Sequence, residues 1–175
     1  MKTRLQLIAL AACCVTTASA QATASPVADA LRSAEQRAGK NLVAAAEVMP
    51  ADKYGFKPTP AQMSFGQVVG HLIEGNDFFC SKLGGVEAPK RAELAPDAPK
   101  DKLVGRLRET FQFCEAALGK ANDGDLAAKL PFFGGREVSR AEMILITAQD
   151  WSDHYSQLAI YLRLNGLLPP TAKKS

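Results

Sequence analysis

The chain has 175 residues, with 21 Lys and Arg against 18 Asp and Glu, and a formal net charge of +3. No basic patch interleaved with aromatic residues stands out, so the sequence gives no support for nucleic-acid binding. No apolar run reaches the roughly 20 residues that a membrane-spanning helix needs, so we do not expect the protein to span a membrane.

The first twenty residues, "MKTRLQLIALAACCVTTASA", have the pattern of a secretory signal peptide. Lys2 and Arg4 precede a short apolar run, and Ala18-Ser19-Ala20 forms a cleavage signal. We therefore expect cleavage after Ala20 and export to the periplasm or the outside of the cell. The mature chain, residues 21–175, has the size of one domain.

A second interpretation of the leader is lipidation. The sequence "LAAC", ending at Cys13, resembles a lipoprotein processing site, and cleavage there would leave a lipid anchor on Cys13. The apolar segment before Cys13 is short for such a site, so we favour cleavage after Ala20.

Two cysteines, Cys80 and Cys114, remain once the leader is removed. In an oxidising compartment two residual cysteines commonly pair, and the predicted disulfide would stabilise the fold by about 3–4 kcal/mol. The alternative is two separate buried thiols, because free cysteine is often buried.

Four helices are predicted from apolar residues at helical spacing and from start and stop signals. Pro26 suits a first helical turn with Ser25 as its cap, and capping boxes begin at Ser64 and Ser139. Gly85 and Gly166 are typical of helix ends. The predicted ranges are 26–49, 64–84, 100–121 and 139–165.

The connections between these helices are rich in proline and glycine. A polar loop follows the second helix, and "KLPFFGGREVSR" before the fourth is either an irregular loop or a minimal hairpin. Four long amphipathic segments without strand alternation predict an all-α, up-down four-helix bundle.

His71, Asp150 and His154 are the candidate metal ligands. Asp150 and His154 are four residues apart and so share one face of the fourth helix, while His71 lies in the middle of the second. Spacing alone leaves ordinary helix chemistry open, because an acid and a histidine at this separation also form simple polar contacts. Trp151 and Tyr155 flank the pair, where packing is their usual role.

Further carboxylates lie close in sequence to the candidate ligands. Glu74, Asp77 and Asp153 could support acid–base chemistry, but nothing in the sequence pairs them with one another.

Two stretches resemble the signatures of the DinB-like superfamily. "HYSQLAIYLRLNGLLPP" (154–170) is similar to its C-terminal signature, and "MPADKYGFKPTPAQMSFGQVVGHLIEGNDFFC" (49–80) to its N-terminal one. The resemblance implies a four-helix bundle, often a homodimer. It also implies a divalent metal, with zinc or nickel favoured and iron or manganese as alternatives, held by one histidine of the second helix and two of the fourth.

Carried over to this chain, the resemblance assigns the first and third ligands to His71 and His154. The second ligand falls on Asp150, where the family usually has histidine. Asp150 then either ligates through a carboxylate oxygen, leaves a weakened site, or orients a histidine from outside the metal's ligand set.

Two functions follow from this resemblance. One is an exported, divalent-metal-dependent hydrolase or transferase that acts on a small molecule of unknown identity. The other is a non-catalytic exported bundle with a degenerate site that binds a metal, a small ligand or a protein partner.

Overall fold

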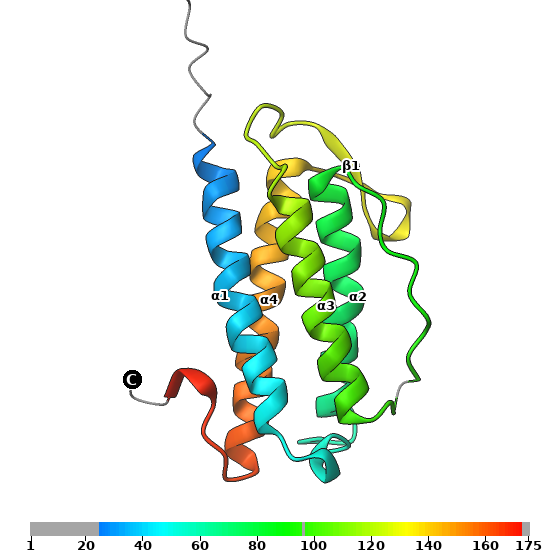
Figure 1. Cartoon of the computed structure of the whole chain (residues 1–175), viewed down its shortest axis with the longest axis vertical. Coiled ribbons are helices and arrows are strands. Elements are labelled where there is room, and N and C mark those ends of the chain that lie inside the picture. The colour runs from blue at the N-terminus through cyan, green and yellow to red at the C-terminus, as the bar shows by residue number, and fades with distance from the viewer. Residues whose placement is uncertain (1–24, 96, 173–175) are drawn as a thin grey trace, which may run out of the picture.

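The computed structural model describes residues 25–95 and 97–172, so the predicted signal peptide and Cys13 lie outside the described residues. Four long helices form a bundle, capped at one end by a small hairpin (Figure 1). The helices are α1 (Pro26–Val48), α2 (Phe65–Gly84), α3 (Lys100–Leu118) and α4 (Arg140–Leu164), with strands β1 (Lys129–Pro131) and β2 (Glu137–Ser139). Short 3₁₀ turns lie at Ala51–Lys53, Phe133–Gly135 and Pro170–Ala172. The predicted all-α bundle is confirmed.

The direction of the helices departs from the predicted up-down alternation. Side-chain contacts join residue 76 of α2 to residue 110 of α3, and residue 80 to residue 114, so α2 and α3 run parallel. The reason is the long segment between them, residues 86–99, which runs back along the length of the bundle (Figure 1). The α4 helix is antiparallel to α2, as the contact between residues 76 and 151 shows.

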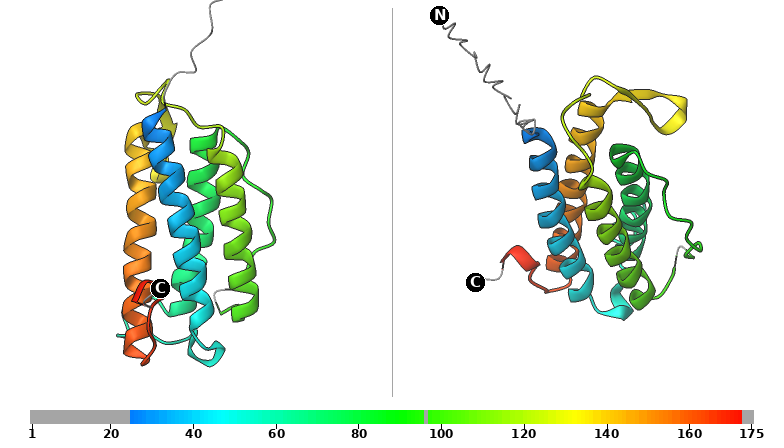
Figure 2. Two further views of the ribbon diagram at one scale, coloured as in Figure 1. Left: turned by 60° about the vertical axis from the view of Figure 1, so that its left-hand side comes forward. Right: turned by 45° about the horizontal axis from the view of Figure 1, so that its top comes forward.

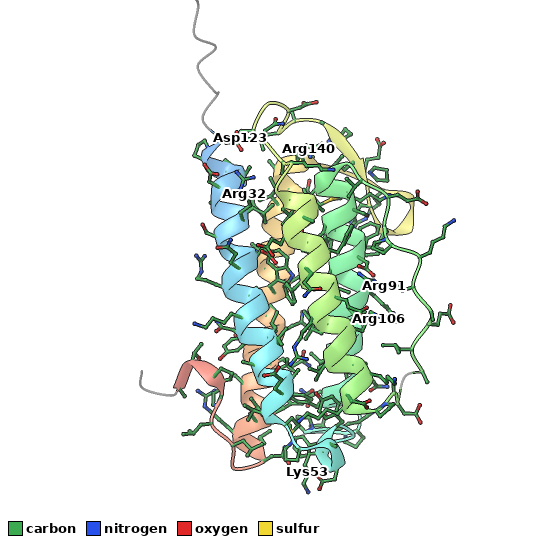
Figure 3. The ribbon with its side chains drawn as sticks, viewed as in Figure 1. Arg32, Lys53, Arg91, Arg106, Asp123 and Arg140 are labelled. Carbon is green, nitrogen blue, oxygen red and sulfur yellow. A yellow bond between two sulfur atoms is a disulfide. The ribbon has the colours of Figure 1, made fainter. Side chains whose placement is uncertain are left out.

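The described residues of this segment, 86–95 and 97–99, lie outside α2 and α3 in both views of Figure 2. Arg91 fastens it, with Nε 2.7 Å from Asp77 Oδ2 on α2 and Nη1 3.1 Å from Glu109 Oε2 on α3. Arg106 of α3 also pairs with Glu109 and donates to the carbonyl oxygen of Ala92 (Figure 3). The polar loop is therefore a strap held to two helices.

The helix starts and ends follow local chemistry. The capping box at Ser64 forms as predicted, since its hydroxyl accepts from Gln67 N–H and the Gln67 side chain accepts from Ser64 N–H. At Ser139 only the first of these two bonds is present, to Glu142 N–H. Gly85, with φ 62°, ends α2, and Gly166, with φ 72°, ends α4.

The N-terminus of α1 is capped from a distant loop. Asp123 accepts hydrogen bonds from the backbone N–H groups of Val27 and Ala28, at 2.9 and 2.8 Å, whereas the predicted cap, Ser25, makes no side-chain capping bond. In return, Arg32 of α1 donates to the carbonyl oxygens of Leu118 and Ala121 (Figure 3). This arrangement ends α3 at Leu118, three residues before the predicted end.

Of the two structures expected for the segment before α4, an irregular loop or a minimal hairpin, it forms the hairpin. β1 and β2 are antiparallel, with Leu130 opposite Val138, and the turn between them has Gly134 and Gly135 at positive φ. Phe133 at this turn stacks on Phe78 of α2, with ring centroids 4.1 Å apart. The hairpin is thereby fixed to the end of α2.

Cys80 and Cys114 form a disulfide that joins α2 to α3, with their Cα atoms 5.0 Å apart. Both cysteines are fully buried in the hydrophobic core. The chain-entropy model gives such a loop about 3–4 kcal/mol of stabilisation. In the described part of the chain, no helix is long and apolar enough to cross a membrane.

Glu35 is an unusual member of the core, because it is an acid with only 4% of its surface exposed. Burial, with a smaller contribution from the negative charge of Glu115, raises its pKa to about 7. The native state therefore binds this proton more tightly than the unfolded chain does. The resulting stability is fully present below about pH 4.5 and is lost as the pH rises through 7.

We expect Glu35→Gln to stabilise the protein at pH 8 but not at pH 4. At pH 8 the substitution removes a buried negative charge, which should raise the free energy of unfolding by about 1–2 kcal/mol, a range reduced for residual solvent screening. Urea denaturation at the two pH values measures the difference. The exposed Glu137→Gln is the matched control, and an equal effect of both variants would contradict the prediction.

Candidate metal centre

The first predicted ligand, His71, lies on the outer side of α2, one residue before the buried Leu72. Its side chain is 49% exposed. Its ring faces that of His154 on α4, with centroids 4.8 Å apart. Both histidines of the chain therefore meet where α2 faces α4.

Asp150 lies between the two histidines. Its Oδ1 is 3.4 Å from Nδ1 of His154 and 3.9 Å from Nε2 of His71. Its carboxylate faces α2 at Gly75, where a Cβ atom would be 3.6 Å from Oδ2. The three predicted ligands are thus brought together, each offering one ligand atom, with these atoms within 4.8 Å of one another.

The backbone also orients His154. Its Nδ1 lies 2.7 Å from the carbonyl oxygen of Asp150, one turn earlier on α4. When Nδ1 carries the proton of the neutral imidazole, it donates to this oxygen, and the lone pair of Nε2 is then available to a metal. Such a bond to the non-ligating nitrogen is usual for metal-binding histidines.

Burial raises the pKa of Asp150, because solvent is partly removed from a carboxylate that is only 18% exposed. The neighbouring His154 and His71 oppose this effect and favour the ionised form, while Asp153 adds a smaller repulsion that raises the pKa further. A cation placed beside the three side chains would favour the carboxylate.

The donor set fits a divalent metal. Two imidazole nitrogens and one carboxylate oxygen form a ligand set that zinc accepts at about 2.0–2.2 Å, with the remaining position open. Two ligands of a tetrahedral ion at that distance are about 3.4 Å apart, so ligand atoms that lie within 4.8 Å of one another would move closer together on binding. A two-histidine, one-carboxylate set also suits iron(II), and the carboxylate oxygen is a ligand type that suits manganese.

A buried hydrogen-bond network beneath the site was not predicted. Trp151 Nε1 donates to Asn76 Oδ1 at 2.8 Å, and Asn76 Nδ2 donates to Thr110 Oγ1 at 3.0 Å. All three side chains are buried and come from α4, α2 and α3. Because Trp151 follows Asp150 directly and Asn76 lies five residues after His71, the network fixes the register that places the ligands opposite one another. A polar residue on an otherwise apolar stripe of α2 was the only sequence signal for it.

The other residues near the predicted site have different roles. Asp77 pairs with Arg91 of the strap, and Asp153 is exposed. Trp151 is a core residue, in line with the packing role expected for it. Tyr155 contacts the C-terminal segment, since its hydroxyl donates to Thr171 Oγ1 and accepts from Thr171 N–H. Both aromatic residues line a hollow between α1 and α4 and not the candidate metal centre.

A cavity of about 720 Å³ adjoins the site between α2 and the strap. His71, Gly70 and Glu74 of α2 form part of its wall, with Leu94 of the strap and Leu103 of α3 on other sides. Both guanidinium groups at its edge, Arg91 and Arg106, are already paired with carboxylates. The cavity is large enough for a small organic molecule.

The fold and the site together define a class of protein: a four-helix bundle with a candidate metal centre made by its second and fourth helices. The model of the DinB superfamily matches residues 35–158, and the chain belongs to this superfamily. This membership confirms the resemblance seen in the sequence.

Solved structures with the same fold include DinB-like proteins from Bacillus cereus and Bacillus subtilis. The first has a TM-score of 0.63 at 17% identity and covers 81% of this chain and 95% of its own. The second has a TM-score of 0.62 at 18% identity, with coverages of 85% and 99%. A mycothiol-dependent maleylpyruvate isomerase is also similar, with a TM-score of 0.58, 11% identity and coverages of 75% and 60%. A search of curated protein sequences finds no match.

We expect Asn76 and Trp151 to be energetically coupled. Asn76→Leu leaves the Trp151 N–H buried without an acceptor and should destabilise the protein by about 1–3 kcal/mol. Trp151→Phe removes the donor but also leaves a cavity, so a double-mutant cycle is needed, and it should give a coupling energy of about 1 kcal/mol. Chemical denaturation measures all four proteins.

Gln149→Leu, at an exposed position of α4, is the control for adding an apolar side chain and should change stability by less than about 0.5 kcal/mol. A coupling energy of zero between Asn76 and Trp151 would show that the two helices are held in register by other contacts.

Proposed function

We propose that this protein is a divalent-metal-dependent hydrolase or transferase acting on a small molecule. The observation that carries the proposal is the meeting of His71, Asp150 and His154, whose ligand atoms come from two helices and lie within 4.8 Å of one another. Membership of the DinB superfamily supports it. The similar fold of an enzyme, the mycothiol-dependent maleylpyruvate isomerase, is compatible with catalysis.

In this proposal His71 and His154 bind the ion through imidazole nitrogens and Asp150 binds through a carboxylate oxygen. Zinc and nickel are the favoured ions, and the carboxylate moves the preference towards harder ions such as iron(II) or manganese. A metal with an open position supplies a Lewis acid and lowers the pKa of a bound water or thiol. The 2.7 Å contact to the Asp150 carbonyl holds the His154 ring in place for this role.

In this proposal the cavity beside His71 is the substrate-binding site. A molecule held between α2 and the strap would contact Leu94 and Leu103 with its apolar part and present its reacting group next to His71. On the α2 side of this cavity the exposed carboxylate is Glu74, and we assign proton transfer to it, because Asp77 is paired with Arg91.

A second function is a non-catalytic bundle with a degenerate site, binding a metal, a small ligand or a protein partner. The observation in its favour is that Asp150 lies within 4 Å of both histidines, which is the separation of a direct ion pair. Protonated histidines could balance the Asp150 carboxylate directly, and the site would then be an internal polar cluster. Metal binding tests the first function, because a protein that takes up no metal cannot be a metal-dependent enzyme.

We expect the protein, purified without an affinity tag and reconstituted with ZnCl₂ or NiCl₂, to bind one ion per chain. Asp150→Ala removes one of three ligands and should weaken binding by at least about tenfold, whereas Asp150→His supplies a third imidazole and should bind these ions more tightly. Elemental analysis and competition with a chelating dye give the stoichiometry and the affinity.

Asp153→Ala is the matched control, because Asp153 is an exposed carboxylate on the same helix outside the cluster. It should leave affinity unchanged. A wild-type protein that takes up no stoichiometric ion, while Asp150→His does, would exclude the metalloenzyme and favour the degenerate site.

We also propose that the protein is exported. The leader "MKTRLQLIALAACCVTTASA" supports export, and so does the disulfide between Cys80 and Cys114, because such bonds persist in oxidising compartments. A homodimer, implied by the family, stays a prediction.

The exported protein should start at Gln21 and contain no free thiol. Intact-mass measurement of the chain recovered from the periplasm or the medium, before and after reduction, should show the mass of residues 21–175 and a gain of two hydrogen atoms on reduction. A lipid-modified N-terminus at Cys13 would support the alternative processing site. Retention of the full leader in cytoplasmic protein would exclude export.

A further inference from the structure

A second hollow lies on the side of the bundle formed by α1 and α3, whereas the candidate metal centre lies between α2 and α4. Its volume is about 390 Å³. Apolar groups form much of its lining, with Val43 and Ala44 on α1 and the ring of Phe111 on α3. Such a volume fits a small organic molecule and is far larger than a bare ion needs.

Glu35 lies in the wall of this hollow and has no partner. Its residue is 96% buried, and within residues 25–95 and 97–172 its carboxyl group makes no hydrogen bond or ion pair. In this part of the chain, every side-chain oxygen that is fully shielded from solvent has a hydrogen-bond partner. Because the oxygens of Glu35 have none, they must still be slightly exposed to solvent. A carboxyl group in this position is open only to something that enters from solvent.

The charged neighbours do not neutralise Glu35. Arg108 is the cation on the α3 side, and it is paired with Glu47. Lys40 lies at an exposed position of α1, with its ammonium beyond ion-pair distance of every carboxylate in the described residues. Glu115 of α3 adds a second negative charge, and together with burial it raises the pKa of Glu35 to about 7. A positive charge in the hollow would relieve both carboxylates.

The ring of Phe111 gives the hollow an aromatic surface. A Cβ atom at Gly39 would be only 3.1 Å from this ring, so glycine at this position lets the ring lie directly against α1. An aromatic ring beside a carboxylate is a favourable surface for an organic cation, because the ring face attracts positive charge and the ring packs against an apolar chain.

We propose that the hollow between α1 and α3 is a binding site for a small organic ammonium ion. Its ammonium group pairs with Glu35 and Glu115, and its short apolar chain lies on Phe111 and Val43. The site is separate from the candidate metal centre and does not depend on the proposed function.

The probe is n-butylammonium chloride. Its binding to the full mature chain at pH 8 is measured by ¹H–¹⁵N NMR titration. We expect saturable shifts confined to the α1 and α3 residues around the hollow, with a dissociation constant in about the millimolar range. The neutral n-butanol and the anionic butyrate have similar apolar chains and should bind at least about tenfold more weakly.

Two variants locate the charge that matters. Glu35→Gln keeps the shape of the side chain and is expected to fold at least as stably, so a loss of n-butylammonium binding by about tenfold or more would be a direct effect of the charge. His71→Ala, at the other site, should bind the probe as the wild type does. Binding of n-butylammonium should also weaken from pH 8 to pH 5, because Glu35 is protonated at pH 5. The other charged residues of the lining are Lys40, Glu47, Arg108 and Glu115.

Three results would overturn the proposal. The first is that residues around the hollow show no saturable chemical-shift change with n-butylammonium at concentrations up to about ten times the expected dissociation constant. The second is equal binding of n-butanol, which would make the hollow an apolar surface only. The third is unchanged binding in Glu35→Gln, which would assign the cation to another part of the surface.

Discussion

The arrangement of this bundle depends on one buried amide, the side chain of Asn76. It accepts from the Trp151 indole and donates to the Thr110 hydroxyl, so three helices share a single polar centre inside the core. Apolar packing alone tolerates sliding and rotation of helices, since hydrophobic contacts are not directional. A buried polar group favours the one helix register in which its hydrogen bonds form, because a buried donor or acceptor without a partner costs about 1–3 kcal/mol. The histidines on α2 and α4 face each other as a consequence.

The rest of the fold adds constraints around this centre. The disulfide holds α2 to α3 four residues further along each helix, and Arg91 holds the strap against the same two helices. The α1 helix is tied to the end of α3 by Asp123 and Arg32. The candidate metal centre therefore shares α2 with both of these attachments, and the strap lines the cavity beside it.

Much of this could be predicted from the sequence, for reasons that particular residues show. Helix limits at Ser64, Gly85 and Gly166 depend on local backbone chemistry, and local chemistry is visible in a single sequence. The candidate ligands were found because only two histidines exist and a family signature surrounds them. The cap from Asp123 and the Asn76 network could not be predicted, since each joins residues far apart in the chain. The parallel course of α2 and α3 was missed because a loop's composition does not say whether it turns back or crosses the bundle.

That parallel course has a consequence for folding. In a bundle of alternating helices each neighbouring pair can form as a local hairpin, but here α2 and α3 can pair only after segment 86–99 has closed a long loop. Contacts between residues this far apart in the sequence raise the contact order of the fold, and a higher contact order is associated with slower folding. The two cysteines meet only once the helices have docked in parallel register, so oxidation would capture chains that have already made the crossover. The disulfide then keeps the docked helices from separating again.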